Sequence, residues 1–543
     1  MALVSARTAE GRMIMWLFAV TLCAQLLVHN GGLSGLDGET YYEVARSVID
    51  QQRLDVDKGF NTVTGVGGHQ YAKSNFGLPL LAAGVYFVSA PVSWVTPAHS
   101  QLIRMALVGA SMTVLISALI IAVYLLARTL SARPSSALIV GIGAVAGTFV
   151  LPYSKEFFAE PMSALGIVIA IERALAGRPV AAGSGLAVAV LARAQSLLFI
   201  PAVLLVIARQ YGVRDAMRAA WPVGAGIVLT VGYNVARFGN PLEFGYPTEG
   251  FTMPFLRGAH LLLLEPSKSV FVFVPVAVLV PWAFLRLWHQ NRNALFLIGS
   301  TLALTFAVAV LWHNPNGGWC WGPRLLIPGV VPAVAALGPW IDTPRNRQLA
   351  IALFVVGFAV SAPAVAVSTQ IQQLDVPSPA GGVWPPDLGL PAVGRQAELV
   401  PVAAAYTVNH LFERKTDGRN NLRYLTLWQL GLTRVFGPSG LVVALTVSLV
   451  LILVGAWTLT RCRAAYSELQ TARRIDPPDR PSTESERPRR SPGQQGGGAE
   501  DTGPKTSFTS CRSTNGGMSR ARRCALSTSS GGSSKFFGFV TGI

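Results

Sequence analysis

The sequence is poor in charged residues. Only 13% of its 543 residues are Asp, Glu, Lys or Arg, whereas 51% are hydrophobic, and the mean hydropathy is +0.44. A soluble protein of this length carries about 25% charged residues, so the composition argues against a soluble enzyme. Apolar runs of the roughly 20 residues that span a bilayer recur along the chain, without the alternation of β-barrel strands. The composition therefore predicts an all-α polytopic membrane protein.

Cysteine and nucleotide-binding motifs are also scarce. The five cysteines form no CxxC pair, which argues against both a disulfide framework and a zinc site. No GxxxxGK or GxGxxG opens a helix, so we expect no nucleotide-binding loop. The net charge is +17, and the tail from residue 461 holds 14 Lys and Arg against 7 Asp and Glu, which makes +7. The remaining excess lies largely in short loops, as expected for contact with anionic membrane lipids, and no nucleic-acid partner is indicated.

The placement of Arg residues predicts the topology. Arg7 and Arg12 precede the first apolar run, so the amino terminus is expected in the cytoplasm, ahead of an uncleaved first helix. Placing every Arg cluster on the same side gives about twelve transmembrane helices and a cytoplasmic carboxyl terminus. Residues 77–95 are rich in Pro and Gly and are expected as a juxtamembrane or re-entrant element, with a full crossing as the alternative. Residues 181–208 are predicted as two short helices with Arg193 at the outer turn, since a charge in mid-membrane costs about 2.5–3.5 kcal/mol or more.

Composition shifts divide the chain into segments. We expect a cytoplasmic amino terminus (1–12), a transmembrane core (13–367) with a catalytic external loop (31–79), an external segment (368–438), a last transmembrane helix (439–460) and a cytoplasmic basic tail (461–543). The external segment includes an amphipathic helix near residues 396–412. The tail is rich in Pro, Ser, Gly and Arg from about residue 475, which predicts disorder. The expected location is the plasma (inner) membrane, with multiple crossings.

Polar side chains concentrate in the loops expected outside the cell. Carboxylates, cations and tryptophans on one side of a membrane suit a sugar-phosphate substrate. Cations hold a phosphate, Trp rings stack on sugars, and a carboxylate can take a proton from a hydroxyl. The candidate catalytic residues are Asp37, Glu39 and Glu160, and the candidate substrate-binding residues are Tyr42, Lys73, Arg193, Lys268, Trp319, Trp321 and Arg324.

Several short motifs follow one another in an order typical of a known family. These are DGETYYEVARSVID (37–50), QYAKSNFGLPLLA (70–82), EFFAEPMSAL (156–165), VARFGNPLEFGY (235–246), LEPSKSVFVFVP (264–275) and GGWCWGPRLLIPGVVP (317–332). They resemble segments of the C-type glycosyltransferase superfamily, in particular the branch of protein O-mannosyltransferases and aminoarabinose transferases. The resemblance covers roughly residues 13–367.

The resemblance implies an inverting transfer of a sugar, mannose-like or other, from a polyprenyl-phosphate donor to an extracytoplasmic acceptor hydroxyl on a glycan, lipid or protein. It implies that Asp37 is the catalytic base and that Glu160 assists, or binds a divalent metal where members use one. Lys73, Lys268 and Arg324 would hold the donor phosphate. Gly38 separates the first two acids, which leaves the role of Glu39 open.

Each assignment has a structural alternative. Asp37 could cap a helix over residues 40–50, and Glu160 could be a favourable charge at a helix amino terminus. The segment GGWCWGPR could form an aromatic belt at the membrane surface, with Arg324 snorkelling. For the whole protein, the alternatives are a transporter or lipid flippase, or a non-catalytic membrane scaffold. An enzyme requires Asp37, Glu160 and Arg324 to face one cavity, and a scaffold does not.

Overall fold

The computed structural model describes residues 2–33, 36–57, 59, 61–318, 320–369, 392–412 and 424–475, and their regular secondary structure is helical apart from one short β-hairpin and one isolated β-bridge. The longer helices are α1 (Ala2–Leu27), α5 (Ser100–Thr129), α7 (Ala159–Leu175), α10 (Val213–Phe238), α14 (Arg292–Leu311), α17 (Pro344–Ala366), α19 (Ala392–Asn409) and α22 (Pro438–Ile475). The shorter ones are α2 (Leu36–Arg46), α3 (Gly77–Val88), α4 (Val92–Val95), α6 (Pro134–Ala146), α8 (Pro179–Ala192), α9 (Ile200–Tyr211), α11 (Phe255–Leu263), α12 (Val270–Phe273), α13 (Val280–Gln290), α15 (Ile327–Ala335), α16 (Leu337–Trp340) and α21 (Trp428–Phe436). The hairpin pairs β1 (Thr62–Thr64) with β2 (Gln70–Ala72) in antiparallel register.

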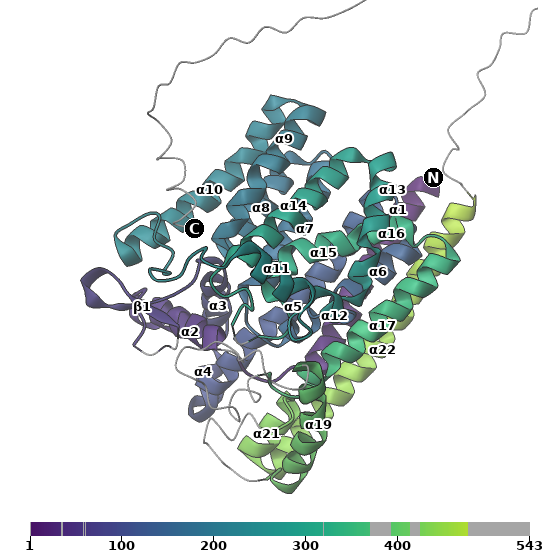
Figure 1. The fold of residues 1–543 in the computed structure, drawn as a ribbon. Helices are drawn as coiled ribbons and strands as arrows, with labels where there is room; N and C mark the ends of the chain where they lie inside the picture. Colours follow the sequence, from purple (N-terminus) through teal and green to yellow (C-terminus); the bar gives the residue numbers. More distant parts are fainter. Residues whose placement is uncertain are drawn as a thin grey trace, which may run out of the picture.

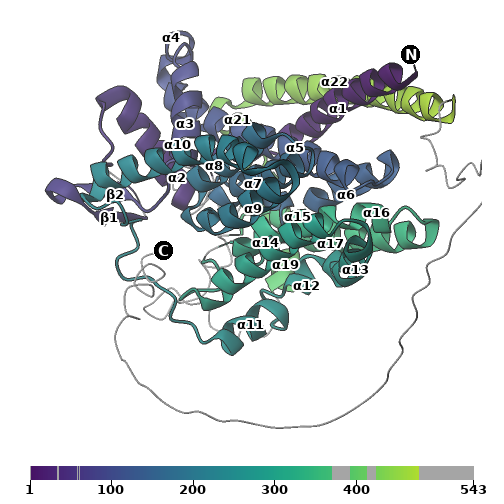
Figure 2. The same ribbon diagram turned by 90° about the horizontal axis from the view of Figure 1, so that it is seen from above.

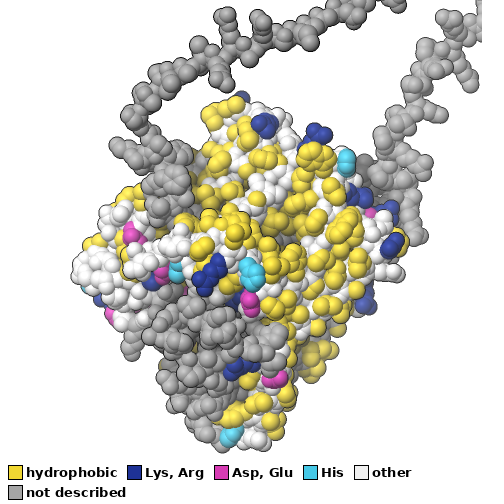
Figure 3. All heavy atoms as spheres, viewed as in Figure 1, with side chains coloured by type: hydrophobic (Ala, Val, Ile, Leu, Met, Phe, Trp, Pro, Cys, Tyr) yellow, Lys and Arg dark blue, Asp and Glu magenta, His cyan; other side chains and the backbone are white. Residues whose placement is uncertain are grey.

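The chain is an all-α polytopic membrane protein. Within the described ranges, seven helical segments are long and apolar enough to cross a membrane, and four shorter apolar helical segments accompany them. Hydrophobic side chains cover much of the face over α9, α14, α13 and α17, as a lipid-facing surface requires (Figure 3). The predicted number of about twelve crossings and the orientation of the termini remain predictions.

Two predicted interruptions of the helices can be compared with the structure. The break around Arg193 is confirmed, because α8 ends at Ala192 and a 3-10 turn over Ala194–Phe199 leads into α9. The segment 77–95 forms α3 and the four-residue α4. The 12 residues of α3 extend about 18 Å, which is short of the roughly 30 Å hydrocarbon core. The juxtamembrane or re-entrant placement of this segment stays a prediction.

The core of the molecule lies around α7, which packs against α5, α8 and α15. Most residues of α7 are buried. It crosses α8 closely because Gly166 lies against Gly185: a Cβ atom added to Gly166 would stand 2.5 Å from the Gly185 carbonyl oxygen. Small residues permit such close contact between membrane helices. The crossing brings the start of α7 beside the end of α8.

The two terminal helices pair along one edge of the molecule. Both views place α1 beside α22 at the edge away from the β1–β2 hairpin (Figures 1 and 2). Trp16 packs edge-on against Trp457 at 4.9 Å between ring centroids, and Arg12 forms an ion pair with Glu468. Two expected segment boundaries do not coincide with helix ends. Residues 2–12 already belong to α1, and α22 continues past residue 460 to Ile475. At both places the charged residues mark the end of the apolar stretch, but the helix continues beyond it.

The segments expected outside the membrane hold small helices and the β-hairpin against the core. Arg237, at the end of α10, is fully buried and stacks on Tyr233 at 3.7 Å. Its Nη1 donates to the Ala72 carbonyl at 2.6 Å, which fixes the hairpin to α10. In the segment 368–438, the amphipathic helix expected near residues 396–412 is confirmed as α19, displaced by a few residues. Residues 370–391, 413–423 and the tail from 476 lie outside the described residues.

Candidate active site

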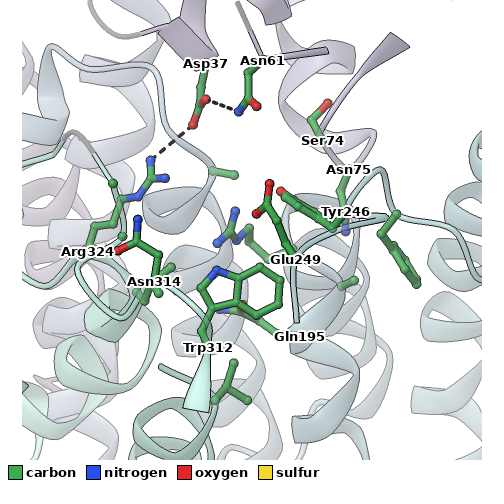
Figure 4. Close-up of a pocket in the computed structure, with 18 of the residues that line it drawn as sticks. Asp37, Asn61, Ser74, Asn75, Gln195, Tyr246, Glu249, Trp312, Asn314 and Arg324 are labelled. Carbon is green, nitrogen blue, oxygen red and sulfur yellow. Dashed lines mark hydrogen bonds and ion pairs between the residues drawn. The ribbon is translucent and has the colours of Figure 1, made fainter. Parts of the chain in front are cut away.

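One cavity of about 260 Å³ lies where α2, the hairpin, the α8–α9 break and the loops around residues 249 and 314 meet (Figure 4). Its polar lining comes from Asp37, Asn61, Ser74, Asn75, Arg193, Gln195, Glu249, His313, Asn314 and Arg324, and its aromatic lining from Tyr41, Phe244, Tyr246, Phe251 and Trp312. Three predicted site residues, Asp37, Arg193 and Arg324, thus face one space. A fourth, Glu160, lies directly behind them in contact with both arginines.

Two acids and two arginines form a continuous ionic group, which we call the ionic end of the cavity. Arg324 Nη1 donates to Asp37 Oδ2 at 3.3 Å, and Arg324 Nε lies 3.6 Å from Glu160 Oε1. Arg193 Nη2 lies 3.2 Å from the same Glu160 oxygen. Glu160 is 1% exposed, whereas Asp37 keeps 17%. Glu160 therefore acts as a buried counter-charge to both arginines, and Asp37 is the carboxylate accessible from the cavity.

Local sequence explains how these four side chains meet. Asp37 lies in the first turn of α2, which begins at Leu36, so Asp37 is inside the helix and not at the expected cap of residues 40–50. Its other oxygen, Oδ1, accepts from Asn61 Nδ2 at 2.7 Å. Glu160 is in the first turn of α7, where a negative charge is favourable, as the helix-terminus alternative proposed. That position also puts it against Arg193 at the end of α8.

Arg324 is positioned by a glycine-rich turn. Gly317 has φ +73°, and a Cβ atom there would stand 2.9 Å from Arg324 Cγ. The Lys268 ammonium donates to the carbonyl oxygens of Cys320 at 2.8 Å and Gly322 at 3.2 Å, which braces the same turn. Trp321 is 2% exposed and packs edge-on against Phe273, so it does not belong to a lipid-facing belt. The snorkelling alternative for Arg324 is wrong, because the guanidinium points into the cavity.

The opposite side of the cavity holds groups that are not among the candidate site residues. Glu249 accepts from Lys73 Nζ at 2.8 Å, and His313 Nε2 lies 3.7 Å from its second oxygen. Trp312 packs edge-on against Tyr246 at 5.8 Å and Phe251 at 5.5 Å. These residues come from irregular loops in which no periodicity singles them out. A usable signal was the density of aromatic residues beside the acid, in the stretches 244–251 and 312–313.

The remaining predicted residues do not line the cavity. Glu39 is exposed, and the Tyr42 hydroxyl donates to Gln101 Oε1 at 2.8 Å. The ammonium groups of Lys73 and Lys268 contact protein oxygens, so their expected phosphate contacts stay predictions. Trp319 lies outside the described residues.

A second charged pair is buried next to the site. Lys155 and Glu156, in the loop before α7, are 4% and 7% exposed, although the sequence suggested an external polar loop. Burial lowers the pKa of Lys155 to about 7 and raises the pKa of Glu156 to about 7. The Lys155 ammonium donates to Thr426 Oγ1 at 2.9 Å, and Thr369 donates to Glu156 Oε1 at 3.0 Å. This pair ties the loop to α17 and the segment before α21.

The cavity is electrically balanced. Three cations at and behind its lining balance three carboxylates: Arg193 contacts Glu160, Arg324 contacts Asp37 and Glu160, and Lys73 pairs with Glu249 from outside the lining. Among the described residues, no group of three or more His, Cys, Asp or Glu side chains could hold a metal ion. The arrangement therefore offers acid–base chemistry at Asp37 and anion binding by displacement of a carboxylate from an arginine.

Comparisons with known proteins give structural similarity only. No family model and no curated protein sequence matches the chain. Among solved structures, the chain is similar to ArnT from Cupriavidus metallidurans bound to undecaprenyl phosphate, at 15% identity and a TM-score of 0.44, covering 85% of this chain and 76% of that one. It is also similar to the arabinosyltransferase EmbB from Mycobacterium smegmatis, at 16% identity and a TM-score of 0.35, covering 84% of this chain but only 41% of that one. These values are too low to transfer a substrate or a residue's role, which must be inferred from the side chains themselves.

Proposed function

We propose that the protein is an integral membrane glycosyltransferase that moves a sugar from a polyprenyl-phosphate donor to an extracytoplasmic hydroxyl. The observation that carries this proposal is the meeting of Asp37, Arg324, Glu160 and Arg193 at one cavity of a chain with many apolar helices. A lipid-linked donor can reach such a cavity from the bilayer, and the chain shows no nucleotide-binding loop for a soluble donor. The arginines supply planar donors suited to a phosphate.

Asp37 acts as the base in this proposal. The acceptor oxygen attacks the anomeric carbon from the face opposite the phosphate, and its proton passes to the Asp37 carboxylate. The bond between the anomeric carbon and the phosphate oxygen breaks, and its electron pair stays on the phosphate. The configuration at the anomeric carbon is therefore inverted. The Asn61 amide, bound to Oδ1, orients the carboxylate for this step.

Arg324 has a role that follows from charge balance. During transfer, one unit of negative charge leaves Asp37, which becomes protonated, and appears on the phosphate. Arg324 contacts Asp37 at 3.3 Å, so the same guanidinium can stabilise a phosphate bound beside it as the charge moves. Glu160 remains fixed behind both arginines and keeps them oriented, so that the electrostatic stabilisation is in place before reaction.

Radiolabel transfer tests the proposal. Membranes containing the full chain are supplied with defined polyprenyl-phosphate sugars, and Asp37→Asn is compared with Glu39→Gln, an exposed acid two residues away. Asn retains the shape of Asp but cannot take a proton, so we expect turnover to fall by about 10²-fold or more with donor binding retained. Arg324→Ala should weaken both donor binding and turnover. Near-normal transfer by Asp37→Asn would refute the assignment of the base.

The same assay distinguishes a glycosyltransferase from a transporter. The helix break at Arg193 beside buried Glu160 is a feature that transporters also use. A transporter would move the lipid across proteoliposomes without transferring label to an acceptor. Label in the acceptor, lost in Asp37→Asn and kept in Glu39→Gln, excludes that alternative.

A further inference from the structure

We propose that the cavity has a sugar end, formed by Gln195, Tyr246, Glu249, Trp312 and Asn314, which binds an uncharged pyranose and discriminates against an amino sugar. This inference rests on the proposed function and adds the class of sugar. Figure 4 shows Trp312, Glu249 and Gln195 on the side of the cavity away from Asp37 and Asn61. The ionic end is thus left for the phosphate and the acceptor, and the sugar end for the ring.

Trp312 provides a rigid apolar wall. Its ring is held by edge-on contacts with Tyr246, at an interplanar angle of 89°, and with Phe251, at 76°. An indole fixed by neighbouring rings presents apolar area at little entropic cost. The C–H face of a pyranose matches such a wall, whereas a phosphate does not.

Two neutral amides accompany this wall, with Gln195 beside Trp312 and Asn314 between Trp312 and Arg324 (Figure 4). Gln195 and Asn314 line the cavity, and neither side chain has a hydrogen-bond partner within the described part of the chain. Each amide can donate two hydrogen bonds and also accept. Groups that both donate and accept are matched by hydroxyls, which do the same. The combination of an aromatic wall and free amides therefore points to a polyhydroxyl ring.

The charge at this end decides between a neutral and an amino sugar. Glu249 is the acid in the sugar end, and Lys73 Nζ already lies 2.8 Å from its Oε1. A sugar ammonium would meet a neutralised carboxylate and the like charge of Lys73. A sugar hydroxyl can instead donate to a remaining lone pair of Glu249 without disturbing the pair. Lys73 is thus a specificity-determining residue that excludes a positively charged sugar.

Equilibrium binding of three lipids to the full chain in nanodiscs tests this inference. The probes are a polyprenyl phosphate, the same lipid carrying glucose, and the same lipid carrying glucosamine, which differs from glucose by one amine. We expect glucose to tighten binding relative to the bare lipid phosphate, and glucosamine to give no such gain. Trp312→Leu should weaken the affinity for the glucose lipid by roughly 2- to 10-fold and leave the affinity for the bare lipid phosphate unchanged. Trp282→Leu, at an exposed position on α13, is the matched control.

Lys73→Met supplies the charge test. Without the ammonium, Oε1 of Glu249 loses its cation and can pair with a sugar amine, while Oε2 keeps its contact with His313. The glucosamine lipid should then gain on the order of 10-fold over the glucose lipid. Adding Glu249→Gln to Lys73→Met should abolish that preference. The assignment of the sugar end is refuted, while the proposed function stands, if the wild type binds the bare lipid and both glycosylated lipids equally. It is also refuted if Lys73→Met leaves the ratio of the affinities for the glucosamine and glucose lipids unchanged. If the bare lipid phosphate does not bind, the proposed function fails and this inference fails with it.

Discussion

Removal of the buried carboxylate of Glu160 should strongly destabilise the protein. Glu160 is 1% exposed and lies 3.2 Å from Arg193 and 3.6 Å from Arg324. At an effective dielectric constant of about 20, each contact corresponds to an attraction of about 5 kcal/mol before the cost of desolvation. Gln keeps the shape but leaves two neighbouring guanidinium groups with Asp37 as their remaining counter-charge. Breaking a buried pair in this way costs about 3–5 kcal/mol. Because Arg193 keeps 21% exposure, we expect a value near 3 kcal/mol.

The double variant distinguishes a charge effect from a packing effect. When Glu160→Gln is combined with Arg193→Gln, both partners of the closer pair become neutral, and the ion pair of Arg324 with Asp37 remains. The double variant should therefore be more stable than the sum of the two single variants predicts, by about 1–3 kcal/mol.

The assay is chemical unfolding of the purified chain in detergent micelles, followed by tryptophan fluorescence. Glu39→Gln is the control, because an exposed side chain away from the cavity should change the free energy of unfolding by no more than about 0.5 kcal/mol. Strict additivity of the two single effects would refute the view that Glu160 is a counter-charge. An effect of Glu160→Gln as small as that of Glu39→Gln would refute its burial between the arginines.

Most of the helical framework could be predicted because apolar length and charge placement are local properties of the sequence. The break at Arg193 followed from the cost of a charge in a long apolar run, and the structure puts the break at that residue. The order of motifs also placed Asp37, Glu160 and Arg324 together, and they meet. What failed was the use of Arg461 to end the last helix. A charge marks where a helix leaves lipid, but it does not stop the backbone hydrogen bonding that continues to Ile475.

The sugar end could not be predicted, since its members depend on long-range packing. Arg237 fastens Ala72 of the hairpin to α10, and the next residue, Lys73, pairs with Glu249. Likewise, Lys155 and Glu156 appear in the sequence as solvent-exposed charges, but they are buried against partners more than 200 residues away. These partners are Val365 in α17, Thr369 just after it, and Thr426 before α21. Sequence proximity gives no sign of such partners. The sequence therefore does not predict the position of polar residues whose partners are distant along the chain.

Two further predictions concern orientation and pH. Glu39 and Arg214 are both exposed, so an impermeant thiol reagent added outside the cell should label Glu39→Cys and miss Arg214→Cys, and the reverse would refute the predicted topology. For pH, burial raises the pKa of Glu156 from 4.5 to about 7. Between these values the folded chain keeps a proton that the unfolded chain has released, so the stability contributed by this group falls as the pH rises. The Glu156→Gln variant lacks this titrating carboxyl, so its stability does not fall for this reason as the pH rises. Relative to the wild type, it should gain up to about 3 kcal/mol between acidic and neutral pH in the same unfolding assay. Parallel pH profiles of the two proteins would show that Glu156 is not held protonated by burial.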